Sequence, residues 1–218
     1  SSHWQKRKAN AKNRIKESTK ILMITAAKRL NSQSYKINFD PIEYEKFSST
    51  FPFIETDDQI KTIEDVKSDF LKLIPADRLI VGDVAFGKTE VIIRAVFLAA
   101  KSKIQSLVLV PTTLLSRQHF NNFSKRLTPF GIKVSEISRL VSTKEKQQII
   151  FSLNEGITDV IIGTQALLND KIHFKKLGLI IYDEEQKLGT RQKEKLEIIS
   201  SLKEGTIDVI IGTHALLN

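Results

Sequence analysis

The chain has no cysteine among its 218 residues. Disulfides and thiolate metal sites are therefore excluded, and the composition fits a cytoplasmic protein. The four histidines lack the spacing of metal ligands, so we expect no histidine metal site. No apolar run approaches the roughly 20 residues that a membrane span needs, and we expect no membrane partner. No signal peptide is visible, and Met23 is the only methionine, so we expect a segment of a longer protein.

The net charge of +9 is concentrated at the amino terminus. Residues 1–36 hold ten of the 34 lysines and arginines and a single acid, Glu17. The rest of the chain is neutral, and a basic appendage is typical of nucleic-acid binding. Residues 3–30 lack glycine and proline and carry a narrow apolar stripe, which predicts a helix. This helix either packs on a neighbour as a solvated amphipathic element or contacts DNA with its basic face.

Short β-branched runs alternate with helical patterns from residue 59 onward. This alternation predicts an α/β fold with a doubly wound, mostly parallel sheet that binds ligands at the carboxyl ends of its strands. The expected strands are 78–82, 106–110, 133–137, 159–162, 177–182 and 207–211, and the expected helices are 59–73, 88–100, 114–127, 143–153 and 191–202. Residues 31–50, with Pro41 as a breaker, predict a linker. We therefore expect an extension over 1–46 and one domain over 47–218.

A phosphate-binding loop lies between the first of these strands and the helix that follows. The segment matches G-x-x-x-x-G-K-[ST] throughout, with Gly82, Asp83, Val84, Ala85, Phe86, Gly87, Lys88 and Thr89. The glycines let the backbone fold tightly around phosphate, and the N–H groups at the helix start supply positive potential. We expect Lys88 to reach the β- and γ-phosphates of ATP and Thr89 to bind Mg²⁺.

Two acids follow the strand predicted at 177–182. We expect Asp183 to hold Mg²⁺ through water and Glu184 to polarise the attacking water, because phosphoryl transfer needs such a pair beside the phosphates. Together with Lys88, they are the predicted catalytic residues.

A glutamine ahead of the P-loop is a candidate contact for the base. The amide of Gln59 can donate and accept at the edge of adenine. The alternative is a helix start capped by Thr56 or Asp57, with Gln59 in the first turn.

Three loops that follow predicted strands suit a nucleic-acid backbone, because their hydroxyls and N–H groups can bind phosphate without reading sequence. Their residues are Pro111, Thr112, Thr113, Arg139, Gly163 and Thr164. Arg139 would add a charged phosphate contact. Helix caps and turns are the alternative explanation for these residues. Gln118 and His119, just downstream of the first loop, are expected on a solvated helix face.

Taken together, these motifs resemble those of superfamily 2 helicases and translocases, in particular the translocase module of the bacterial transcription-repair coupling factors. The resemblance runs from about Trp4 to Leu196. The segments that carry it are the basic helix at the start, Phe51-Pro52-Phe53, Glu55-Thr56, Asp58-Gln59, 82–90, 109–118 and Asp183-Glu184-Glu185-Gln186.

The resemblance implies a P-loop NTPase with a RecA-like lobe that uses ATP and Mg²⁺ to move on double-stranded DNA. It also implies RNA polymerase and excision-repair proteins as partners. Two alternatives remain: a fragment of a branch-migration helicase, which shares the P-loop and the acidic motif, and a non-motor remnant or adaptor that binds nucleic acid through the basic helix.

The chain departs from the family pattern in three places. Ala85 stands where glycine is usual, and Lys187-Leu188-Gly189-Thr190 stands where Arg-Phe-Gly-Val is usual. The third departure is a repeat, since residues 193–218 match residues 144–169 at 19 of 26 positions. We expect the strand at 207–211, within the repeat, to replace a family strand that ends in Thr-Ala-Thr. These 218 residues show no second motor lobe with its arginine finger, so we expect nucleotide binding with little or no hydrolysis, and no translocation by this chain alone.

Overall fold

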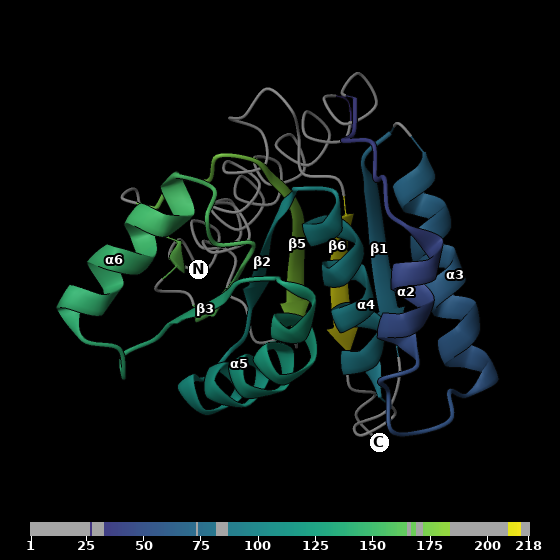
Figure 1. Cartoon of the computed structure of the whole chain (residues 1–218), viewed down its shortest axis with the longest axis horizontal. Helices are drawn as coiled ribbons and strands as arrows, with labels where there is room; N and C mark the ends of the chain where they lie inside the picture. Colours follow the sequence, from purple (N-terminus) through teal and green to yellow (C-terminus); the bar gives the residue numbers. More distant parts are fainter. Residues whose placement is uncertain are drawn as a thin grey trace, which may run out of the picture.

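The computed structural model describes residues 27, 33–72, 74–81, 87–164, 167–168, 172–183 and 209–214. Within these residues, six strands form one parallel sheet in the order β1-β6-β5-β2-β4-β3, as Figure 1 shows. The strands are β1 (Ala76–Val81), β2 (Gln105–Leu109), β3 (Val134–Ile137), β4 (Val160–Gly163), β5 (Leu177–Asp183) and β6 (Val209–His214). The predicted α/β class and parallel sheet are confirmed. The helices predicted at 3–30 and 191–202 fall outside the described residues, apart from Ala27.

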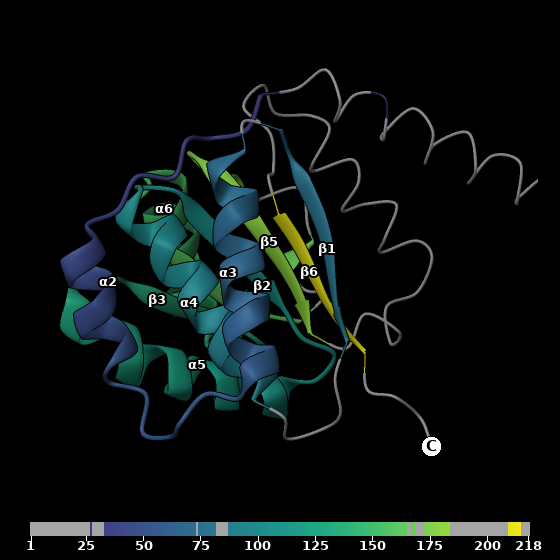
Figure 2. The ribbon, with the colours of Figure 1, turned by 90° about the vertical axis from the view of Figure 1, so that its right-hand side faces the viewer.

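Helices cover both faces of this sheet. They are α2 (Pro41–Ser48), α3 (Asp57–Leu71), α4 (Lys88–Lys101), α5 (Thr113–Leu127), the short 3-10 helix η1 (Thr128–Phe130) and α6 (Thr143–Asn154). Figure 2 shows α3 and α4 on one face. Because side chains alternate along a strand, β2 sends Val108 into the core beneath these helices and Leu107 into a second core with Leu153 of α6. None of the described helices is long and apolar enough to cross a bilayer.

The predicted linker is wrong over residues 41–48, which form α2. Pro41 opens this helix instead of breaking it, because a proline has no N–H to lose at the first helical position. Asp40 caps the helix by accepting a hydrogen bond from the backbone N–H of Ile42 at 2.9 Å. The ring of Phe47 is fully buried and stacks on Phe97 of α4 at 4.0 Å between centroids. Helix α2 therefore belongs to the packed fold.

The strand predicted at 207–211 is confirmed as β6, which lies between β1 and β5 and is parallel to both. Val209 pairs with Ala76 on one side and with Leu179 on the other. The earlier copy of the repeat supplies β4 at the other side of β2. The carboxyl ends of all six strands consequently meet at one edge of the sheet.

We predict that Phe47→Ala lowers the free energy of unfolding by about 3–5 kcal/mol, because it leaves a cavity beneath α2. Chemical denaturation followed by circular dichroism measures this change. Ile42→Ala is the matched control on the same helix, where the side chain is 77% exposed; its expected cost is about 0.5 kcal/mol or less. Equal effects of the two substitutions would show that α2 is not part of the cooperative fold.

Candidate functional site

The described part of the P-loop, residues 87–89, leads directly into α4. Gly87 is the residue before the helix and has a left-handed backbone with φ of 68°. A Cβ atom there would collide with Nε2 of Gln59, so glycine serves both the conformation and the close approach. Lys88 and Thr89 are half-buried in the first turn of α4. Gly82, Asp83, Val84, Ala85 and Phe86 lie outside the described residues.

Gln59 takes part in a helix cap and also lies against the P-loop. Its Oε1 atom accepts a hydrogen bond from the backbone N–H of Thr56 at 3.0 Å, and Thr56 Oγ1 accepts one from the Gln59 N–H at 3.3 Å. The capping alternative is therefore confirmed. The close approach of its Nε2 atom to Gly87 shows that the cap holds this amide beside the phosphate-binding segment.

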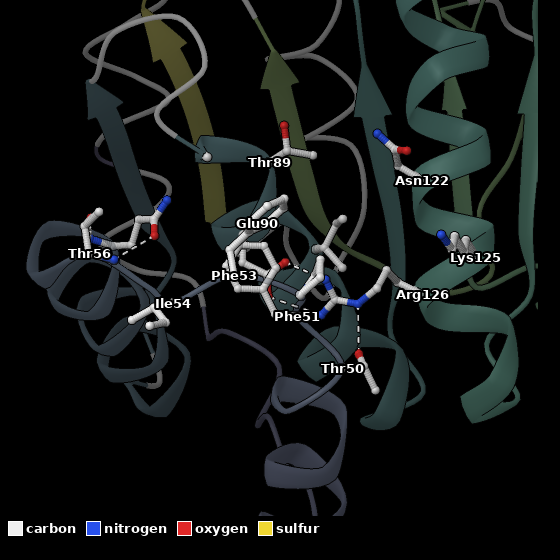
Figure 3. A pocket seen from close by; sticks show the side chains of 14 residues that line it. Thr50, Phe51, Phe53, Ile54, Thr56, Thr89, Glu90, Asn122, Lys125 and Arg126 are labelled. Atoms are coloured by element: carbon white, nitrogen blue, oxygen red, sulfur yellow. Dashed lines mark hydrogen bonds and ion pairs between the residues drawn. The ribbon is translucent and has the colours of Figure 1, made fainter.

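A pocket of about 760 Å³ opens next to these residues. Its volume lies within the usual range for small-molecule sites, roughly 300–1,000 Å³. Figure 3 shows the rings of Phe51 and Phe53, which meet edge to face with centroids 5.5 Å apart, and Asn122 and Lys125 on α5. The lining residues are 50–54, Thr56, Gln59, Gly87, Thr89, Glu90, Ile93, Asn122, Lys125 and Arg126. An apolar aromatic wall with a few polar groups suits a flat heterocycle.

Beneath the pocket lies a network of buried charges around Glu90, which is 3% exposed. Arg126 Nη1 donates to Glu90 Oε2 at 2.7 Å, and Arg94 Nε donates to Glu90 Oε1 at 2.8 Å. Arg94 also pairs with Glu55. A hydrogen bond from its own backbone N–H, followed by the one from Arg94, lowers the pKa of Glu55. Burial opposes the charge of Arg94, but the hydrogen bonds to Glu90 and Glu55 outweigh it and raise the pKa of Arg94.

Arg126 joins the pocket wall to the core. Its guanidinium lies over the ring of Phe47 at 4.9 Å and near the ring of Phe51 at 5.7 Å, and its Nε donates to Thr50 Oγ1 at 2.9 Å. No sequence motif includes this residue. The Glu90–Arg94 pair could have been found from its i,i+4 spacing on a helix, but no local pattern marks a partner on another element.

The acidic end of the site is described as far as Asp183, the last residue of β5, and Glu184 lies outside. Asp183 Oδ2 is 2.7 Å from Nε2 of His119. The predicted solvated position of His119 is wrong, because only 5% of this residue is exposed; Gln118 is exposed as expected. Helical spacing is the sequence signal that could have predicted this position, because it places the polar side chain of His119 on the side of the helix that faces the sheet.

A magnesium ion bound to nucleotide needs few protein ligands, since it keeps several waters and takes phosphate oxygens. In the described part of the chain, no group of three or more histidines and acids could hold a metal alone. The predicted pair of one hydroxyl and one carboxylate, Thr89 and Asp183, has the oxygen chemistry that Mg²⁺ prefers. Thr89 comes after β1 and Asp183 ends β5, and the carboxyl ends of these two strands share one edge of the sheet.

The three predicted nucleic-acid loops come together at the ends of β2, β4 and β3, which are neighbours in the sheet. The Val110 N–H donates to the Gly163 carbonyl at 3.0 Å. A Cβ on Gly163 would collide with the Ile137 carbonyl, so the close approach of these two backbones requires glycine. Thr112 caps α5 by accepting from the Leu115 N–H at 3.2 Å, which confirms the capping alternative there. Three other residues of these loops differ in solvent exposure: Pro111 and Thr164 are half-buried, and Arg139 is exposed.

Comparisons with known proteins agree with this architecture. Residues 56–216 match the family model for DEAD/DEAH box helicases. The chain is 47% identical over 196 residues to the transcription-repair-coupling factor of Rickettsia typhi, which covers 88% of the chain and 18% of that protein. For the Escherichia coli factor the identity is 40% over 188 residues, and the coverage is 86% and 16%. The chain thus spans less than a fifth of these curated relatives' length.

Among solved structures, RecG bound to a three-way DNA junction is similar, with a TM-score of 0.73 and 28% identity over 86% of this chain and 25% of the RecG chain. A helicase structure from Sulfolobus tokodaii has a TM-score of 0.62 at 18% identity, covers 81% of this chain and 51% of that chain, and supports the fold alone.

We predict that Arg126→Ala lowers the free energy of unfolding by about 3 kcal/mol, because it removes one partner from the buried carboxylate of Glu90. Lys125→Ala changes the neighbouring exposed charge on the same helix and should cost about 0.5 kcal/mol or less. Urea denaturation of both variants measures the difference. A loss for Arg126→Ala no greater than that for Lys125→Ala would contradict the role given to the buried network.

Proposed function

The chain belongs to the DEAD/DEAH box helicase family, and from this premise we propose that it is the ATP-binding first motor lobe of a double-stranded DNA translocase. We propose that this translocase is of the transcription-repair coupling factor type, because the chain is 40–47% identical in sequence to those factors. The observation that carries the proposal is the shared sheet edge, where β1 leads into the P-loop and β5 ends at Asp183.

In this proposal each residue has one task at that edge. The backbone of residues 82–87 and the amine of Lys88 bind the phosphates, and Gln59 with the aromatic wall binds adenine. Thr89 and Asp183 hold Mg²⁺, which neutralises charge on the phosphates when bound. Glu184 orients and polarises the attacking water.

The three loops at the ends of β2, β4 and β3 bind the DNA backbone. Their hydroxyls and N–H groups contact phosphate without reading bases, and the exposed Arg139 supplies charge. RNA polymerase and excision-repair proteins are the proposed partners of the whole translocase, because the matched relatives are named for coupling transcription to repair.

A branch-migration helicase is the second candidate. The observation that favours it is the similarity to RecG, whose structure contains a three-way DNA junction. Competition between junction DNA and linear duplex of equal length separates the two, since a branch-migration enzyme would prefer the junction.

We predict that Lys88→Ala weakens ATP binding at least about tenfold, because a charge-assisted contact to phosphate contributes about 1.5–3 kcal/mol. Titration with a fluorescent ATP analogue measures the dissociation constant. Lys101→Ala, at the opposite end of the same helix, is the control and should leave it unchanged. Unweakened binding by the Lys88→Ala variant would overturn the assignment of the nucleotide site.

A second prediction concerns DNA. Arg139→Ala should weaken duplex binding and reduce the slope of log affinity against log salt by about 0.9, the value for one lost phosphate contact. Lys133, just before the other end of β3, gives a charge-matched control. Fluorescence anisotropy at several salt concentrations gives both slopes. Equal slopes for Arg139→Ala and the unmodified chain would place the DNA elsewhere.

A further inference from the structure

His119 is a buried polar residue for which the proposed reaction so far has no use. It lies two turns into α5, faces the sheet, and brings Nε2 to 2.7 Å from Asp183 Oδ2. The two residues are 64 positions apart in the chain. The Asp183 side chain remains 17% exposed, whereas that of His119 is only 6% exposed. The hydrogen bond therefore joins a buried side chain, His119, to a partly exposed acid of the candidate site, Asp183.

The direction of this hydrogen bond follows from the donors present. An ionised carboxylate only accepts, so Nε2 of His119 donates to Asp183. The other ring nitrogen, Nδ1, is buried and has no hydrogen-bond partner among the described residues. The N–H of Nε2 is directed at Asp183.

The ring is also held from the side. Phe123, one turn further along α5, meets it edge to face with centroids 5.7 Å apart, and is itself fully buried. A donor fixed in this way restricts rotation of the carboxylate that it binds. Partners of this kind behind a metal ligand commonly change metal affinity by about 10–100-fold.

We propose that His119 is a positioning residue that fixes the Asp183 carboxylate in the orientation needed to hold nucleotide-bound Mg²⁺. This inference rests on the proposed ATP site. It assigns His119 no contact with nucleotide or metal, because the side chain is buried and its Nε2 is used by Asp183. Its loss should therefore change the Mg²⁺ requirement and leave Mg²⁺-independent binding of the nucleotide intact.

The test uses the full chain and a fluorescent ATP analogue titrated with Mg²⁺. His119→Phe keeps an aromatic ring and removes the donor, and should raise the Mg²⁺ concentration for half-maximal enhancement of binding by about tenfold. Binding measured in EDTA should stay within about twofold. His119→Gln, whose amide nitrogen can occupy the place of Nε2, should restore most of the Mg²⁺ response. Gln118→Ala, at an exposed neighbouring position, is the control.

Comparing His119→Asn with His119→Gln keeps the proposal testable if His119→Phe misfolds, which circular dichroism would detect. The amide of His119→Asn is one bond shorter than that of His119→Gln and does not reach Asp183, so the Asn variant should need more Mg²⁺ than the Gln variant. An unchanged Mg²⁺ requirement in folded Phe or Asn variants would overturn the positioning role. Absence of nucleotide binding by the unmodified chain, with or without Mg²⁺, would instead overturn the proposed function.

Discussion

The pairing of β6 with both β1 and β5 is the constraint on which the candidate site depends. Among the described strands, β1 pairs with β6 alone, so the strand that leads into the P-loop reaches the rest of the sheet through β6. One strand between two others sets a separation of roughly 10 Å between β1 and β5. Asp183, which ends β5, therefore lies two strands away from β1, at the same edge of the sheet where β1 leads into the P-loop.

The same tetrapeptide, Val-Ile-Ile-Gly, forms strands in two places, at 160–163 and at 209–212. Each copy has a parallel neighbour on both sides, namely β2 and β3 for the first copy and β5 and β1 for the second. A strand flanked in this way suits a continuous β-branched sequence, because both of its faces are normally covered. Both positions in the sheet favour a continuous β-branched sequence, which explains how a repeated segment can complete the sheet.

Periodicity was enough to predict the strands, their parallel arrangement and most helices, because each depends on residues close together in the chain. The prediction of a break at Pro41 is wrong, since a proline breaks a helix interior but favours a helix start. His119 and Arg126 could not be placed from sequence. Their partners, Asp183 and Glu90, are 64 and 36 positions away, and only the packing of α5 on the sheet brings them together.

Helix α5 thus supports the candidate site at two points. At one, His119 binds the carboxylate that ends β5; at the other, Arg126 binds Glu90. Glu90 directly follows Thr89, so the first turn of α4 carries a predicted metal ligand and, beside it, a buried charge with one partner on α4 and one on α5. A buried ion pair adds little net stability compared with an apolar pair of equal volume, but it tolerates few alternative geometries. The network is therefore better suited to fixing the orientation of the P-loop turn than to stabilising the fold.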